Sequence, residues 1–315
     1  DLDQAYYQRI KLGFDPDLLR DRFLALRREV RRTLGRKDGL GGILCDTIDQ
    51  YLLVIELLRS RGTGDFGRYS RELYGSARDH LRGDRKSLRQ LGEKLCEIFS
   101  LPAAEHLARP YQKHITAPAA VDILQQRLGS YFQPGDIRVI LSDGIVSDAA
   151  AGGDYIKINQ DAEFTEFDLQ VLEVSEGWVH VGTTLNGRRQ PWASWLSVGS
   201  PRVTACQEGL AVLMETLTFS SYPRRALKVS DRVVAVDMAE QGADFIEVYR
   251  FFCERDMPAR DAYKITQRVF RGGTVRGGSV FTKDLSYLRG FVENVNFIRS
   301  AIHSGAPEIL PMLFV

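Results

Sequence analysis

Apolar residues recur every three or four positions through the first hundred residues, which is the period of an amphipathic helix. Five of them fall on one helix face: Leu18, Leu19, Phe23, Leu26 and Val30. Asp15-Pro16 marks the start of that helix. The same spacing predicts further helices over residues 43–58, 69–80 and 86–99. We therefore expect residues 1–115 to form an N-terminal helical region.

The pattern changes after Pro118. A helix is predicted over residues 121–131, and two short runs of β-branched and apolar residues predict strands over 136–141 and 154–158. Asp143-Gly144 lies between the two runs and is a turn signal. The chain is therefore expected to have an α+β fold that is mainly helical and contains a small β-sheet.

Helical periodicity returns over residues 164–181. Asn186-Gly187 and Gln190-Pro191 then predict a long ordered loop over residues 183–204. Trp192 and Trp195 would pack this loop down, or either would form a wall of a binding pocket. Further helices are expected over residues 208–218, 230–242, 244–255, 259–270 and 286–302. Residues 116–315 would form a second region, and the two regions would pack into one compact unit.

Charge and composition exclude several classes of protein. The 42 basic residues are balanced by 41 acidic ones, so no overall field attracts nucleic acid or an anionic membrane. No apolar run approaches the roughly 18–20 residues that span a bilayer. The four cysteines are widely spaced and include no Cys-x-x-Cys pair, which favours a reducing, cytoplasmic compartment over a disulfide framework.

Candidate chemistry gathers around residue 176. Glu176 and His180 are four residues apart, so on a regular helix they share a face. Glu208 follows 28 residues after His180 and precedes an apolar run. A helical acid–histidine pair completed by a distant glutamate is typical of zinc peptidase sites, although these sites usually carry two histidines on the first helix.

The sequence around these residues resembles that of one protein family. Glu-Gly-Trp-Val-His-Val-Gly-Thr-Thr-Leu-Asn-Gly-Arg-Arg-Gln-Pro at 176–191 and Gln-Glu-Gly-Leu-Ala at 207–211 carry the resemblance, as do residues 268–272 and 281–287. These runs are similar to the bacterial flavohemoglobin expression-modulating QEGLA motif proteins, relatives of the microtubule-associated tyrosine carboxypeptidases. That resemblance implies a mainly helical zinc peptidase fold with a His-Glu-x-x-x-His motif.

The resemblance also implies roles for individual residues. Glu176 would be the general base, and His180 and Glu208 would be zinc ligands. Ser175 stands where the family has its first histidine ligand. Two ligands five residues apart on a regular helix diverge by about 140°. This motif therefore predicts a π-bulge in the helix over residues 164–181, the site helix, and Gly177 would accommodate the bulge.

The serine leaves two functional hypotheses. In the first, the chain is a zinc-dependent carboxypeptidase acting on peptide or protein C-terminal tails, and its zinc binding and activity are impaired because Ser175 offers only a neutral hydroxyl. In the second, the chain is a non-catalytic peptide-binding or scaffold protein that retains the peptidase fold. Neither hypothesis involves nucleic acid or a membrane.

Secondary roles follow from the same resemblance. Arg271, Arg276 and Lys283 are candidates to capture a substrate carboxylate, and Tyr287 is a candidate donor to the scissile group. Asn186 and Gln190 are candidates for hydrogen bonds that support the metal ligands. The small sheet would either hold a substrate backbone along its edge strand or simply cover the core. For each of the four substrate candidates the simpler interpretation remains structural: a surface charge for Arg271, Arg276 and Lys283, and a core tyrosine for Tyr287.

Overall fold

A computed structural model describes residues 3–35, 38–81, 83, 85–101, 113–145 and 147–315. The expected fold class is confirmed, because helices dominate the described residues and the strands form small sheets. Contacts divide the chain into two compact units. The first unit comprises Asp1–Cys96, Ser200–Val203 and Val229–Ser286, and the second comprises Glu97–Gly199, Thr204–Lys228 and Tyr287–Val315. These units differ from the regions expected at 1–115 and 116–315, and the domain organisation stays a prediction.

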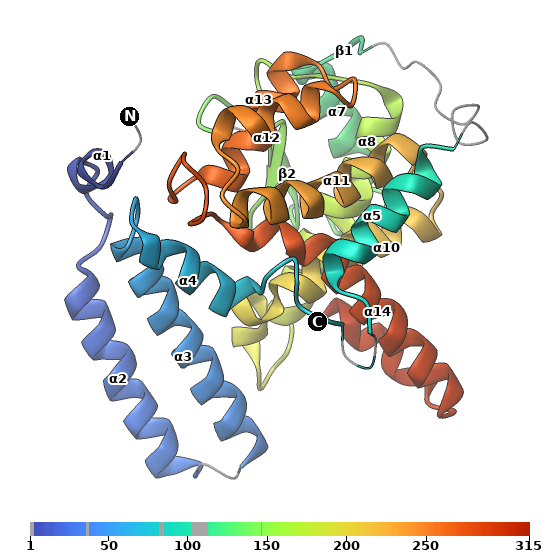
Figure 1. The fold of residues 1–315 in the computed structure, drawn as a ribbon. Helices are drawn as coiled ribbons and strands as arrows, with labels where there is room; N and C mark the ends of the chain where they lie inside the picture. The colour runs from blue at the N-terminus through green and yellow to red at the C-terminus, as the bar shows by residue number, and fades with distance from the viewer. Residues whose placement is uncertain (1–2, 36–37, 82, 84, 102–112, 146) are drawn as a thin grey trace. The chain divides into compact units, whose positions relative to one another are not determined.

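The first unit is built from helices (Figure 1). Its elements are α1 (Gln4–Arg9), α2 (Pro16–Thr33), α3 (Gly39–Arg59), α4 (Gly64–Tyr74), most of α5 (Leu88–Phe99) and α11 (Pro223–Glu240), α12 (Phe245–Cys253), α13 (Ala259–Phe270), and the 3₁₀ turns η3 (Pro201–Val203) and η4 (Thr282–Asp284). The α2 helix begins as predicted: the Asp15 carboxylate accepts hydrogen bonds from the amides of Asp17 and Leu18, and Pro16 occupies the first turn. Helices α2 and α3 then run side by side.

Distant parts of the chain are joined inside the first unit by buried polar contacts. The amide of Gly67 on α4 donates to the Ser279 hydroxyl at 2.8 Å, and Ser279 in turn donates to the Thr63 carbonyl. One turn further along α4, the Ser70 and Thr282 hydroxyls lie 3.0 Å apart. These contacts connect the N-terminal helices to the segment after α13, which explains why residues 229–286 belong to the first unit.

The second unit contains the sheet and the predicted site. Its elements are β1 (Ile115–Thr116), α7 (Ala117–Leu128), β2 (Arg138–Ser142), β3 (Ala149–Ala151), β4 (Tyr155–Asn159), β5 (Glu163–Phe164), α8 (Glu166–Leu172), the π-helix η1 (Glu173–Val181), α9 (Gly182–Arg188), the 3₁₀ turn η2 (Ser194–Ser197), α10 (Thr204–Leu217), most of α14 (Leu285–His303), and the 3₁₀ segment η5 (Pro307–Phe314). Three strands form one sheet in the order β2–β4–β3, with β2 parallel and β3 antiparallel to β4. Strands β1 and β5 form a separate antiparallel pair.

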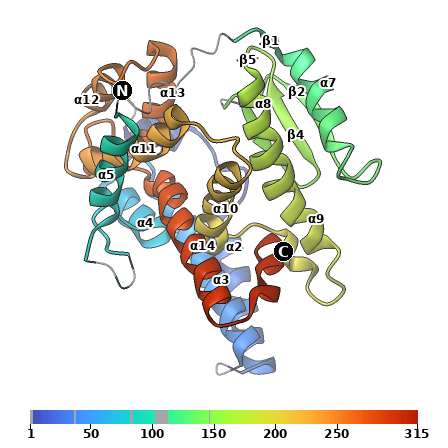
Figure 2. The same ribbon diagram turned by 90° about the vertical axis from the view of Figure 1, so that its right-hand side faces the viewer.

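A hydrophobic core joins this sheet to the helices of the second unit. Alternate strand residues turn inward, and Val139, Ile156 and Ile158 pack with Leu124 and Leu128 of α7. Leu169, Val181 and Leu185 join this cluster from three consecutive helical segments. Figure 2 shows α7, α8 and α9 grouped with the strands. The helical segment from α8 to α9 is thus anchored on this core through Leu169 near its start and Val181 and Leu185 near its end.

The predicted loop over residues 183–204 is wrong in its first part. The chain continues from η1 directly into the helix α9, and 3₁₀ turns follow at η2 and η3. Leu185 is buried in the core, so tertiary packing outweighs the turn preference of Asn186-Gly187. Trp192 does not pack the segment down, because 95% of its surface is exposed. In the described chain, no helix is long and apolar enough to cross a membrane.

Candidate functional site

One continuous helical segment carries the first half of the site. It begins at α8, where Thr165 and Asp168 form a capping box, and passes through η1 into α9. The predicted bulge is confirmed, since Glu173–Val181 is π-helical. A π-helix bonds residue i to residue i+5, so Ser175 and His180 lie one turn apart on the same face. A Cβ on Gly177 would overlap the Leu128 side chain, so close packing on α7 also requires this glycine.

The structure brings His180 and Glu208 together. Helix α10 packs on η1, and the His180 Nε2 lies 3.9 Å from the Glu208 Oε2. Both side chains are largely buried, with 22% and 15% of their surfaces exposed. The Thr183 hydroxyl lies 3.2 Å from the His180 carbonyl and 3.0 Å from the Gln207 Oε1. Residues 28 apart in sequence therefore face each other across the two helices.

Glu176 has different partners. Its Oε2 accepts a hydrogen bond from the backbone amide of Ala151 at 2.9 Å, and its Oε1 accepts one from the Ser175 hydroxyl at 3.3 Å. Ala151 belongs to β3, which is an edge strand of the three-stranded sheet. Ser175 itself is buried, with 4% of its surface exposed. The candidate base is thus bound to the sheet edge on one side and to its sequence neighbour on the other.

These donors do not fit a zinc site with three protein ligands. His180 and Glu208 supply an imidazole and a carboxylate, which zinc accepts. At the position of the family's first ligand stands the Ser175 hydroxyl, a neutral oxygen that donates a hydrogen bond to Glu176. Within the described ranges, no group of three or more His, Cys, Asp and Glu side chains is arranged to hold a metal ion. As the chain stands, the donor set is incomplete.

The microtubule-associated tyrosine carboxypeptidase family model matches residues 3–315. The chain belongs to this family. No curated protein matches the chain. The match extends over both compact units, so helices α2 and α3 are part of the family region along with the motif segments.

The candidate substrate residues of this family member are divided between the two units. Arg271, Arg276 and Lys283 belong to the first unit, and Tyr287 belongs to the second, near the start of α14. The Arg271 guanidinium lies 4.8 Å from the centre of the Phe281 ring, a cation–π contact within the first unit. Capture of a substrate carboxylate by these cations stays a prediction.

The amides of Asn186 and Gln190 have identified partners. The Asn186 Nδ2 donates to the Phe314 carbonyl at 2.9 Å, and the Gln190 Nε2 donates to the Asn186 carbonyl at 3.3 Å. Asn186 therefore fixes the η5 segment, whose Leu313 and Phe314 pack against the cluster formed by Val179, Leu210 and Ala211. Support of the metal ligands by these two amides stays a prediction.

Sequence reasoning missed the hydroxyls and the amide that surround the candidate ligands. Thr183 and Thr184 both lie within hydrogen-bond distance of the His180 carbonyl, one turn along the helix. Gln207 then joins this group from α10 through Thr183. The available signal was the position of these residues, since the threonines follow His180 by three and four residues and Gln207 directly precedes Glu208.

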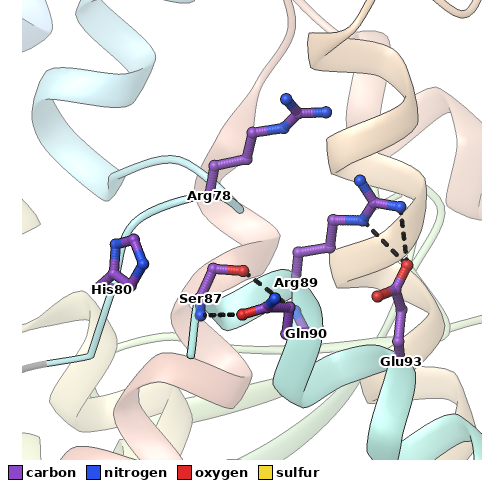
Figure 3. A pocket seen from close by; sticks show the side chains of 6 residues that line it. All are labelled: Arg78, His80, Ser87, Arg89, Gln90 and Glu93. Carbon is purple, nitrogen blue, oxygen red and sulfur yellow. Dashed lines mark hydrogen bonds and ion pairs between the residues drawn. The ribbon is translucent and has the colours of Figure 1, made fainter. Parts of the chain in front are cut away.

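A cavity of about 460 Å³ lies elsewhere, in the first unit (Figure 3). Its lining residues are Arg78, His80, Ser87, Arg89, Gln90 and Glu93. Ser87 and Gln90 bond to each other at the start of α5, and Arg89 pairs with Glu93. Arg78 and Arg89 also pair with the buried Asp237. Both arginines that line the cavity are therefore paired with carboxylates of the protein. None of the predicted site residues lines this cavity.

Proposed function

We propose that this chain is a carboxypeptidase-family protein that recognises the C-terminal tail of a peptide or protein, and that its hydrolytic activity is impaired. The observation that carries the proposal is the Ser175–Glu176 pair. Where the family motif implies a zinc-binding imidazole, a serine hydroxyl donates to the carboxylate that would act as base. His180 and Glu208 then supply two zinc donors, too few for tight binding.

The edge of the sheet supports recognition of a peptide backbone. Gly152 and Asn159 donate to Tyr155 and Asp148, and Ala150 is opposite Lys157 in the register, so the even-numbered residues of this segment bond to β4. Ala149 and Ala151 consequently face away from β4. An extended peptide can add to such an edge by β-augmentation. The Ala151 amide donates to Glu176 and the Ala149 carbonyl accepts from the Ser147 hydroxyl, so a peptide added here would replace these contacts and lie beside the candidate base.

The same hydrogen bonds favour a second candidate, a non-catalytic tail-binding protein. Glu176 and Ser175 satisfy each other without a metal ion, so the cluster is complete as a structural element. Both candidates place the protein in the cytoplasm and give it a peptide tail as partner. They differ in whether the fold can still cleave a bound tail once a third zinc ligand is restored.

Substitution of Ser175 tests the proposal. Ser175→Cys supplies a zinc ligand of nearly the same size, and Ser175→His supplies the family's ligand at the risk of overpacking a buried position. We expect the unsubstituted protein and a Ser175→Ala control to retain well under one zinc per chain after dialysis against a weak chelator. Ser175→Cys, and Ser175→His if circular dichroism shows it folded, should retain about one zinc per chain, because each restores a third ligand.

Turnover then distinguishes the two candidates. Unstructured tail peptides are offered to each variant, and release of the C-terminal residue is followed by mass spectrometry. We expect Ser175→His to cleave the tail and the added Glu176→Gln change to abolish cleavage while zinc is retained, because the acid is a base and not a ligand. Tail binding without cleavage by both restored variants would favour the non-catalytic candidate. Stoichiometric zinc and tail cleavage by the unsubstituted protein would refute the proposed impairment.

A further inference from the structure

Two opposite faces of helix α10 pack against other helices of the second unit. Gln207 and Glu208 contact Thr183 and His180, and Leu210 and Ala211 pack with Val179, so this face lies against the site helix. Gly209 and Ala211 point about 200° apart on a helix, so Gly209 lies on the opposite face. That opposite face lies against α14, and Figure 2 shows α10 between the site helix and α14.

The contact between α10 and α14 is a crossing of two glycines. A Cβ on Gly209 would overlap the backbone of Gly290 and Phe291, and a Cβ on Gly290 would overlap the carbonyl of Ala205. The backbones therefore approach more closely than any other residue pair at these positions would allow. This explains the glycine that follows Glu208 in the motif: it is required by the packing of α14.

One turn beyond Gly290, Asn294 fixes the register of the crossing. Its side chain is buried, with 3% of its surface exposed. The Asn294 Nδ2 donates to the Cys206 carbonyl at 2.9 Å, and the Cys206 thiol lies 3.5 Å from the Asn294 Oδ1. Burial, with Glu293 nearby, raises the pKa of the Cys206 thiol. Asn294 thus holds α10 two residues before Glu208.

We propose that Gly290 and Asn294 are positioning residues that set the approach of Glu208 to His180. Helix α10 packs on η1 on one side and on Gly290 and Asn294 of α14 on the other, so a displacement on the α14 side is transmitted to the site side. A methyl group at position 290 would push α10 away by roughly the size of that group, an appreciable fraction of the 3.9 Å between His180 and Glu208. Loss of the Asn294 amide would free the start of α10 to shift along α14. This role holds whether or not the chain cleaves a peptide.

Asn294→Ala and Asn296→Ala form a matched pair for the test, since Asn296 lies on the same helix but is exposed. Two signals are measured in each protein. The first is the alkylation rate of Cys206 by iodoacetamide, resolved by peptide mass spectrometry, which reports opening of the α10–α14 contact. The second is the pair of ring resonances of His180, which are tractable because the chain has five histidines and are assigned with His180→Gln.

We expect Asn294→Ala to raise the Cys206 alkylation rate by roughly fivefold to tenfold, as loss of one buried hydrogen bond implies. It should also move the His180 ring resonances in the direction that Glu208→Gln moves them. Asn296→Ala should leave both signals unchanged, and Gly290→Ala, if folded, should change both more strongly. Faster alkylation with unmoved His180 resonances would overturn the positioning role, and so would unchanged alkylation in Asn294→Ala.

Discussion

Removal of the Glu176 carboxylate should release the edge strand β3. In the structure the Glu176 Oε2 accepts a hydrogen bond from the Ala151 amide of this strand at 2.9 Å. A hydrogen bond to a charged group contributes about 1.5–3 kcal/mol when its partner is left without an acceptor. Since about 1.4 kcal/mol corresponds to a tenfold change in an equilibrium constant, Glu176→Ala should accelerate hydrogen exchange of the Ala151 amide by about 10- to 100-fold. The amide is followed by nuclear magnetic resonance after transfer to deuterium oxide.

Glu173→Ala is the matched control, because Glu173 lies in the same π-helix and pairs with Arg127 of α7 at 3.7 Å. Its loss should leave the exchange of Ala151 close to that of the unsubstituted protein. Glu176→Gln should give an intermediate rate, since its amide oxygen can still accept. Equal protection of Ala151 in the Glu176→Ala protein and the parent would refute the idea that Glu176 holds the edge strand.

Two further predictions concern buried ion pairs. Arg225→Leu should destabilise the protein by about 3–5 kcal/mol in urea unfolding, because Glu215 is fully buried and both its oxygens accept from Arg225. Glu215→Leu combined with Arg225→Leu should recover most of that loss, and a double variant as unstable as the single one would contradict the argument. For Asp284, burial would raise the pKa, but the charges of Arg268 and then Arg232 outweigh it and hold the pKa well below its ordinary value. Its contribution is therefore present above about pH 4 and is lost as pH falls toward the depressed value, so the stability deficit of Asp284→Asn should shrink when unfolding is measured at successively lower pH; a deficit independent of pH would be evidence against this linkage.

The helices and the distortion of the site helix were within reach of the sequence. Apolar periodicity located α2 and α3, and Asp15-Pro16 located the start of α2 because capping depends on adjacent residues alone. The π-helix followed from the family resemblance, which implies two ligand positions five residues apart, and such side chains share a face only where the helix is wound more loosely. Each of these features depends on residues close together in sequence.

The partners of Glu176 were out of reach. Ala149–Ala151 carries no strand signal, because alanine is depleted in strands, and the segment becomes a strand only through its pairing with β4. The assignment of residues 229–286 to the first unit has the same cause. It depends on contacts such as Ser70 with Thr282, 212 residues apart, which no local pattern reveals. Trp192 is likewise 95% exposed although its side chain is apolar, so its composition alone did not predict its burial.

The π-helix fixes the number of residues between the two ends of the site helix. Deleting one residue between Glu173 and Val181 would rotate the helix after the deletion by about 100°, and Leu185 would then point away from the core that Leu169 enters. Substituting a residue in this segment does not change the number of residues in it. Ser175 is an example, because it occupies the first-ligand position with its hydroxyl bonded to Glu176. In this architecture the length of the segment and the glycine at position 177 are under structural constraint, while the side chain at position 175 is not a condition for the helix to form. A reactive side chain at that position can therefore be exchanged for an inert one without changing the backbone that presents the other site residues, and the reverse exchange depends only on the space around a buried side chain.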